Sequence, residues 1–180
     1  MAETATINIG VSQCLLGEEV RFDGGHRHDN YITGRLGAFF TFIPVCPEVE
    51  AGFGIPREPI RLEGDPVDPV VISHRTRRNL THPLNEASRR IVRNLEGACL
   101  HGFILKKNSP SCGMERVKVY GDSGPPLRKG AGLFARALIQ AQPLLPVEEE
   151  GRLNDPRLRE NFIERIFVYH RFALYLMIVK

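Results

Sequence analysis

Short apolar runs alternate with longer amphipathic segments along the first 150 residues of the chain. Three runs have the length and the β-branched or aromatic content of buried strands: residues 6–12 (TINIGVS), 41–46 (TFIPVC) and 99–107 (CLHGFILKK). Two shorter runs, 69–73 (PVVIS) and 143–150 (PLLPVEEE), fit the same description. Between residues 47 and 68 glycine and proline are so frequent that the pattern predicts irregular backbone.

The clearest helical period covers residues 81–98. Its apolar residues recur on one face, as in a helix that packs against a sheet: Leu84, Ala87, Ile91, Val92 and Leu95. Thr81 is the predicted N-cap, with Pro83 in the first turn, and Gly97 is predicted to end the helix. Shorter helices are predicted over residues 30–40 and 132–140. A long helix is predicted to start at Asp155, its expected cap, and Pro156.

Strands that alternate with helices favour parallel pairing. The pattern therefore predicts an α/β fold, a three-layer sandwich around a mainly parallel sheet, with a C-terminal helix in addition. We expect one domain over residues 1–150 and a separate helical segment over residues 151–180, because the composition changes after EEEGRLNDP. In such sheets, binding sites form in the crevice beyond the carboxyl ends of the strands.

Composition and charge indicate a folded, globular chain, with 42% hydrophobic and 25% charged residues. Residues 151–180 hold six Lys or Arg against three Asp or Glu, which accounts for the net charge of +3. Such a segment suits nucleic acid or an acidic partner, and a solvated helix face explains it equally well. No secretory signal is visible, and the longest apolar run, residues 172–179, is shorter than the about 20 residues of a membrane helix. We therefore expect a cytoplasmic protein with reduced cysteines and no membrane contact.

Three of the four cysteines follow a predicted strand and lie next to proline or glycine. The local sequences are SQCLLG around Cys14, PVCPE around Cys46 and PSCGM around Cys112. If the strands are parallel neighbours, their carboxyl ends meet at one edge of the sheet, and three thiols converge there. Cys99 differs because it begins a strand without a turn residue directly after it, and we interpret it as structural.

The residue pattern alone leaves several interpretations of these thiols open. A free cysteine often behaves as a small buried apolar residue. Zinc sites and redox disulfides commonly show C-x₂-C pairs, which this sequence lacks. A [4Fe–4S] cluster normally takes four cysteines, so three would leave one iron open to a substrate. His26, His28 and Asp29 form a less favoured metal-site candidate, because three ligands within four loop residues would have to fold back sharply on one ion.

Four motifs in order bear on this choice: VSQCLLGEEVRFDGG, VCPEVEAGFGIPREPIRL, GFILKKNSPSCG and GAGLFARAL. Together they closely resemble the DUF523 family, the thiouracil desulfidases. The resemblance implies a Rossmann-like domain that holds a [4Fe–4S] cluster through Cys14, Cys46 and Cys112. It also implies the non-redox removal of sulfur from a thiocarbonyl pyrimidine, which yields uracil and sulfide. The open iron would bind the thiocarbonyl sulfur as a Lewis acid while water attacks the carbon.

The same resemblance implies roles for other residues inside these motifs. Glu48 is expected to activate the attacking water and to return a proton. Ser109 matches a second catalytic position and would hold the pyrimidine by hydrogen bonds, and Ser111 is a second candidate for that task. Asp23 and Arg57 would either bind substrate or orient loops by an ion pair, and we favour the structural role.

The tail, LPVEEEGRLNDPRLRENFIERIFVYHRF, resembles the opening of DUF1722, a helical domain of proteins similar to thiouridine desulfidases of tRNA. Only the opening of that domain is recognisable, so the part expected to hold RNA is missing, and either a free base or tRNA is the expected substrate. Basic residues that would still meet phosphates are Arg75, Arg77, Arg78, Arg89, Arg90, Arg93, Arg165 and Arg171. The rival function is a non-catalytic zinc- or thiol-based binding protein.

Overall fold

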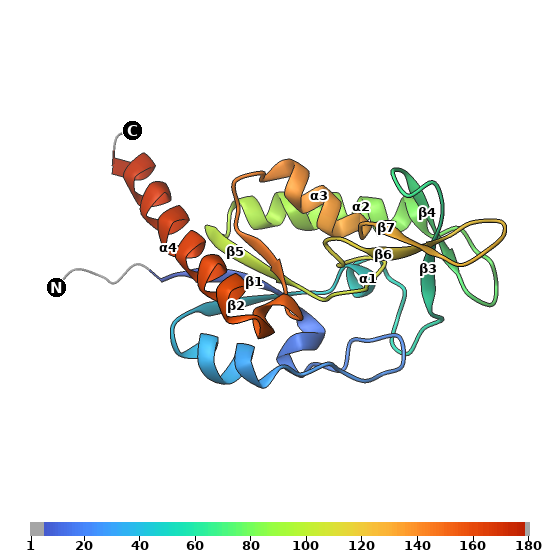
Figure 1. The fold of residues 1–180 in the computed structure, drawn as a ribbon, viewed down its shortest axis with the longest axis horizontal. Helices are drawn as coiled ribbons and strands as arrows, with labels where there is room; N and C mark the ends of the chain where they lie inside the picture. The colour runs from blue at the N-terminus through green and yellow to red at the C-terminus, as the bar shows by residue number, and fades with distance from the viewer. Residues whose placement is uncertain (1–5, 179–180) are drawn as a thin grey trace.

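A four-stranded parallel sheet, here called sheet A, forms the centre of the protein in a computed structural model that describes residues 6–178 (Figure 1). Its strands run in the order β2 (Thr41–Val45), β1 (Asn8–Ser12), β5 (Leu100–Leu105) and β8 (Val147–Glu149). Every neighbouring pair is parallel. The mainly parallel sheet that the alternating pattern predicts is therefore confirmed.

Helices cover both faces of sheet A. On one face lie α2 (Thr81–Glu96) and α3 (Leu133–Ala141), where Phe134 packs with Phe103 of β5 in one apolar cluster. On the other face lie the turns η2 (Tyr31–Arg35) and η3 (Leu36–Ala38) and helix α4 (Pro156–Ile178), where Phe162 packs with Ile9 of β1. Each such buried side chain contributes about 1.5–3 kcal/mol through the hydrophobic effect. The predicted three-layer α/β sandwich is confirmed.

A second, smaller sheet, sheet B, lies at the end of the molecule away from α4 (Figure 1). Its order is β4 (Pro69–Ser73), β3 (Ile60–Gly64), β6 (Val117–Tyr120) and β7 (Leu127–Gly130). The central pair is parallel, and both outer pairs are antiparallel. The expectation of irregular backbone over residues 47–68 is wrong for β3 and for the short helix α1 (Pro47–Glu50). Strand β3 is defined by pairing with the distant β6 and by one fully buried side chain, Leu62, so local composition does not reveal it.

The helix ends show where local signals hold. Asp155 caps α4 as predicted, because its Oδ1 accepts hydrogen bonds from the backbone N–H groups of Arg157 (2.9 Å) and Leu158 (3.2 Å). Thr81, in contrast, is not the N-cap of α2. It is the first helical residue, and its hydroxyl accepts a hydrogen bond from the backbone N–H of Val71 in β4 at 2.8 Å. The Thr81 hydroxyl therefore bonds to strand β4 instead of capping its own helix.

Other local predictions are confirmed in part. The apolar face of α2 is buried, and Gly97 follows the last residue of this helix. The helix predicted over residues 30–40 is instead a π-helical turn followed by a 3₁₀ turn. Two glycines in this segment disfavour a regular helix. The expectation that Cys99 begins a strand is wrong: it is exposed in the turn before β5, with φ of 48°. Within residues 6–178 no helix has the length and apolar character to cross a membrane.

Candidate functional site

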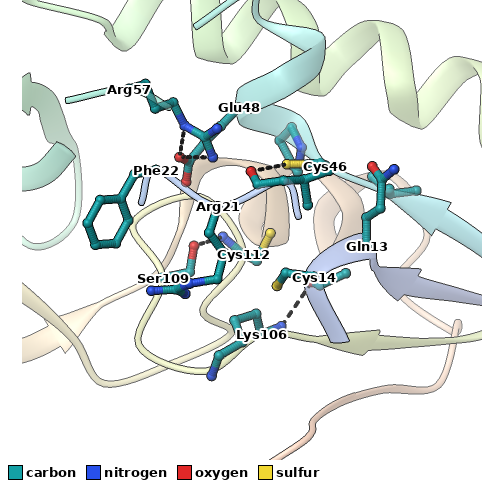
Figure 2. Close-up of a pocket in the computed structure, with 14 residues that line it drawn as sticks. Gln13, Cys14, Arg21, Phe22, Cys46, Glu48, Arg57, Lys106, Ser109 and Cys112 are labelled. Carbon is teal, nitrogen blue, oxygen red and sulfur yellow. Dashed lines mark hydrogen bonds and ion pairs between the residues drawn. The ribbon is translucent and has the colours of Figure 1, made fainter. Parts of the chain in front are cut away.

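Three cysteines meet at the carboxyl edge of sheet A, as the sequence predicts. Cys14 lies in η1 (Gln13–Leu16), the turn after β1, Cys46 directly follows β2, and Cys112 lies in the turn after β5. These strands are parallel neighbours, so their ends deliver all three side chains to one pocket, where Figure 2 shows them close together. The space between the lining atoms, counted together with the solvent at its mouth, is about 430 Å³.

Hydrogen bonds from the backbone to the Ser109 hydroxyl fix the turn that carries Cys112. The Ser109 hydroxyl accepts the backbone N–H of Ser111 at 3.2 Å and that of Cys112 at 3.0 Å. Gly132, just before α3, approaches this turn so closely that an added Cβ would lie 2.4 Å from the backbone carbon and oxygen of Ser111. Glycine permits this approach because it has no Cβ. The turn and the start of α3 therefore hold Cys112 in place together.

Burial makes the three thiols weak acids. It raises the pKa of Cys14 to about 11, and the nearby Cys46 adds to this effect. Burial also raises the pKa of Cys46 and raises that of Cys112 well above its usual range. Lys106 and Arg21 act in the opposite direction, lowering the pKa of Cys14. A metal that binds here through thiolates therefore has to displace a proton from each thiol.

Glu48 lies on the wall of the same pocket, in the first turn of α1. Arg57 Nε donates to Glu48 Oε2 at 2.8 Å, and Arg57 Nη2 forms an ion pair with the same oxygen at 2.8 Å. The Ser111 hydroxyl donates to Oε1 at 2.6 Å. The Arg57 side chain is 5% exposed and that of Glu48 14%, so the ion pair is largely shielded from solvent. One carboxylate oxygen is thus held by a cation and the other by a hydroxyl.

The two serines predicted from the motifs have different surroundings. Ser109 lines the pocket, and its hydroxyl oxygen accepts backbone hydrogen bonds. Ser111 is fully buried, and its hydroxyl reaches Glu48. Ser109 is therefore placed to meet a ligand, whereas Ser111 is placed to orient the carboxylate.

Asp23 and Arg57 each form an ion pair, but they do not pair with each other. Arg57 lines the pocket and pairs with Glu48. Asp23 lies outside the pocket lining, is exposed, and lies 3.3 Å from Arg21. The backbone N–H of Gly25 donates to Asp23 at 3.2 Å and, with the Arg21 charge, lowers the pKa of this carboxyl. The geometry agrees with loop orientation by each residue, and Arg57 alone of the two also lines the pocket.

Further residues line the pocket without an assignment from the sequence, and four of them are labelled in Figure 2: Gln13, Arg21, Phe22 and Lys106. All four lie within the motifs VSQCLLGEEVRFDGG and GFILKKNSPSCG, so a signal was present. The missing information was the path of the loop after Cys14. That loop turns back on itself, because the backbone N–H of Arg27 donates to the carbonyl of Cys14 at 2.8 Å.

The alternative metal site at His26, His28 and Asp29 does not form. The His28 ring lies 2.9 Å from the Thr33 hydroxyl, and Asp29 caps η2 by accepting two backbone N–H groups. Within residues 6–178 no group of three or more His, Cys, Asp or Glu is arranged to hold a single metal ion. This statement includes the three pocket thiols.

Comparison with known families matches residues 9–150 to the family of 2-thiouracil desulfurases. The chain belongs to this family. The 2-thiouracil desulfurases are enzymes, and the resemblance to the thiouracil desulfidases predicted from the motifs is confirmed. The matched range of the 2-thiouracil desulfurase family includes the three pocket cysteines and every other lining residue, and it ends with β8.

Two related proteins show how far the likeness of this 2-thiouracil desulfurase family member extends in sequence and in fold. The uncharacterized protein YbbK of Bacillus subtilis (strain 168) is 31% identical over 150 residues, which are 81% of this chain and 97% of the relative. The solved structure of the [4Fe–4S]-dependent thiouracil desulfidase TudS (DUF523Vcz) matches with a TM-score of 0.70 at 27% identity. The match covers 87% of this chain and 97% of TudS. The fold and the family thus agree, while the resemblance of the tail to DUF1722 stays a prediction.

Proposed function

We propose that this protein is a [4Fe–4S]-dependent desulfidase that converts the thiocarbonyl group of a thiolated pyrimidine into a carbonyl and releases sulfide. One observation carries the proposal: the ends of three neighbouring parallel strands bring Cys14, Cys46 and Cys112 to one pocket, with Glu48 on its wall. The family match and the likeness to TudS support the same chemistry.

The donor set fits a cluster better than a single ion. Thiolates are the usual ligands of iron–sulfur clusters. The pocket supplies three such thiols, one fewer than the four protein ligands of a closed zinc site. Cys14, Cys46 and Cys112 would hold the cluster. When bound, the cluster supplies an iron without a protein ligand, which acts as a Lewis acid toward the thiocarbonyl sulfur.

The residues of the chain supply the proton transfers. Overall, the thiocarbonyl compound and one water yield the carbonyl compound and hydrogen sulfide, without oxidation or reduction. The Glu48 carboxylate takes a proton from the water that attacks the carbon and later gives this proton to the departing sulfur. Arg57 and Ser111 each hold one oxygen of this carboxylate, so its position is set before the substrate arrives. Ser109, on the pocket wall, would hold the pyrimidine by a hydrogen bond from its hydroxyl.

The decisive experiment is sulfide release by the anaerobically purified protein. We expect a brown protein with about four irons per chain that releases sulfide from 2- or 4-thiouracil. Colourless protein that carries one zinc and releases no sulfide would contradict the proposal and favour the non-catalytic binding protein. The ring position of the sulfur follows from which of the two isomers reacts.

The substrate is a free thiopyrimidine or a thiouridine in tRNA, and the same assay separates them. Among the basic residues considered for phosphate contacts, Arg77, Arg89 and Arg90 each pair with a glutamate. We therefore propose the free base as the first substrate to test. If thiolated tRNA releases sulfide and both free thiouracils are inert, the free-base form of the proposal is wrong.

We further propose that residues 1–150 form the desulfidase unit and that residues 151–180 form a helical extension of it. The end of the family match at residue 150 supports this division. Helix α4 contacts the sandwich through the buried side chains of Phe162 and Ile166, while Phe167, Val168 and Tyr175 are exposed. A version of the chain that ends after residue 150 would expose those contacts, so we expect it to fold with lower stability. Chemical denaturation measures this difference.

A further inference from the structure

One wall of the cysteine pocket is formed by Arg21 and Phe22, which lie on the loop after η1 (Figure 2). Backbone hydrogen bonds hold this loop. The Arg21 N–H donates to the Gly25 carbonyl at 3.2 Å, and the Phe22 carbonyl accepts the N–H of Arg57 at 2.9 Å. The guanidinium carbon of Arg21 lies over the Phe22 ring, 5.1 Å from its centroid. The loop therefore presents both side chains to the pocket in a fixed arrangement.

Arg21 has a hydrogen-bond donor that the protein does not use. Its side chain is 17% exposed, and its buried Nε has no hydrogen-bond partner among the residues that the structure describes. Nε lies 3.3 Å from Asp23 Oδ1, but the two groups are not aligned as donor and acceptor. A buried N–H without an acceptor is unfavourable, so a ligand that brings an acceptor is favoured at this position.

The other two cationic side chains of the pocket are already engaged. Arg57 is bound to Glu48, and Lys106 forms an ion pair with Glu150 beyond the end of β8. Arg21 also faces a carboxylate, since its Nε lies 3.3 Å from the exposed Asp23, but this Nε has no hydrogen-bond partner among the described residues. Arg21 is therefore the pocket cation with a donor left for a part of the substrate that takes no part in the reaction.

The proposed substrates carry a group of the required kind. A thiouracil has one thiocarbonyl group, which reacts, and one ring carbonyl, whose oxygen is a hydrogen-bond acceptor that the reaction leaves unchanged. We propose that Arg21 is a specificity-determining residue that binds this ring carbonyl oxygen, an inference that rests on the proposed function. A site built to hydrogen-bond one group of a substrate strongly rejects an analogue that lacks this group. Arg21 thereby selects thiouracils over simple cyclic thiones.

The test compares 4-thiouracil with pyrimidine-4-thione, which lacks the ring carbonyl oxygen and, with it, the hydrogen on the ring nitrogen N1. Replacing Arg21→Met keeps the apolar stem and removes the donors. We expect the variant to lose about 100-fold in kcat/KM for 4-thiouracil and less than about 3-fold for pyrimidine-4-thione. For each substrate, kcat/KM of the variant is divided by kcat/KM of the unmodified protein, so a difference in the intrinsic reactivity of the two thiones cancels. Arg27→Met is the matched control, because Arg27 is exposed on the same loop and lies outside the pocket lining, so both rates should stay unchanged.

Two outcomes would overturn the inference. An equal loss on both substrates, at equal iron content, would mean that Arg21 acts only through the structure of the loop. Unchanged kcat/KM on 4-thiouracil would mean that Arg21 does not bind the substrate.

A binding measurement without turnover separates this inference from the proposed function. Uracil, the expected product, keeps the ring carbonyl, and we expect Arg21→Met to weaken its binding about 10-fold or more in calorimetric titrations of the anaerobic protein. Binding of uracil that depends on Arg21, in a protein that releases no sulfide, would support the inference while the proposed function fails. If uracil binds to Arg21→Met and to the unmodified protein with equal affinity, or binds to neither, the inference is overturned even where sulfide is released.

Discussion

Arg57 Nε donates to Glu48 Oε2 at 2.8 Å, and Arg57 Nη2 forms an ion pair with the same oxygen at 2.8 Å. The two residues are nine positions apart, and their ion pair joins α1 to the loop that leads into β3. Its location beside the thiols gives the pair two consequences, one for stability and one for catalysis.

Replacing Arg57→Ala leaves the Glu48 carboxylate without its cation in a site largely shielded from solvent. Breaking a buried pair on one side typically costs about 3–5 kcal/mol, and we expect the free energy of unfolding to fall by about 3 kcal/mol. A denaturant titration monitored by circular dichroism measures this free energy of unfolding. Arg89→Ala is the matched control, because Arg89 and Glu86 form an exposed pair, worth less than about 1 kcal/mol. Equal losses in the two variants would contradict the prediction.

Replacing Glu48→Gln removes the base while keeping the size of the side chain. We expect sulfide release from thiouracil to fall at least about 100-fold, because general acid–base groups typically contribute this much or more. Iron content and visible absorbance should stay at the level of the unmodified protein. Glu50→Gln is the control, since Glu50 lies on the same short helix but is exposed, and it should keep full activity. Loss of colour in Glu48→Gln would show instead that Glu48 supports the cluster site.

The thiols should differ in their reactivity toward iodoacetamide in metal-free protein. Cys99 is exposed, whereas burial raises the pKa of Cys14 to about 11. At pH 8 we expect Cys99 to be alkylated first and Cys14 to react slowly, because the thiolate is the nucleophile. Below pH 11 the thiolate fraction of Cys14 rises about tenfold per pH unit, so its labelling should accelerate accordingly. Peptide mass spectrometry gives the rates. Cys14 and Cys99 reacting equally fast at pH 8 would refute this.

Replacing Gly132→Ala should disturb the turn that carries Cys112. The new Cβ would lie 2.4 Å from the Ser111 backbone, so the turn has to shift, and overpacking of this kind costs about 1–3 kcal/mol or more. We expect lower iron content per chain as well as lower stability. In Gly34→Ala the added Cβ meets nothing within 4 Å, so cluster loading should be unaffected. Normal iron content in Gly132→Ala would show that the close approach is not required for metal binding.

The sequence by itself determined the parts of the protein that depend on local order. The apolar runs predicted all four strands of sheet A, and Asp155 with Pro156 predicted the start of α4. Turn residues beside Cys14, Cys46 and Cys112 predicted which thiols meet at one edge of the sheet. These features are readable because each rests on residues that are neighbours along the chain. The motifs supplied the family in the same way, since they are read in order.

Only the tertiary structure decided which distant groups meet. Sheet B exists because β3 pairs with β6, some 50 residues further along the chain. Glu48 is bound by Arg57 and Ser111, and the Thr81 hydroxyl serves β4 instead of its own helix. The physical reason is the same in each case. A donor, an acceptor or a strand edge bonds with whichever partner the folded chain brings within reach, and separation along the sequence does not reveal that partner.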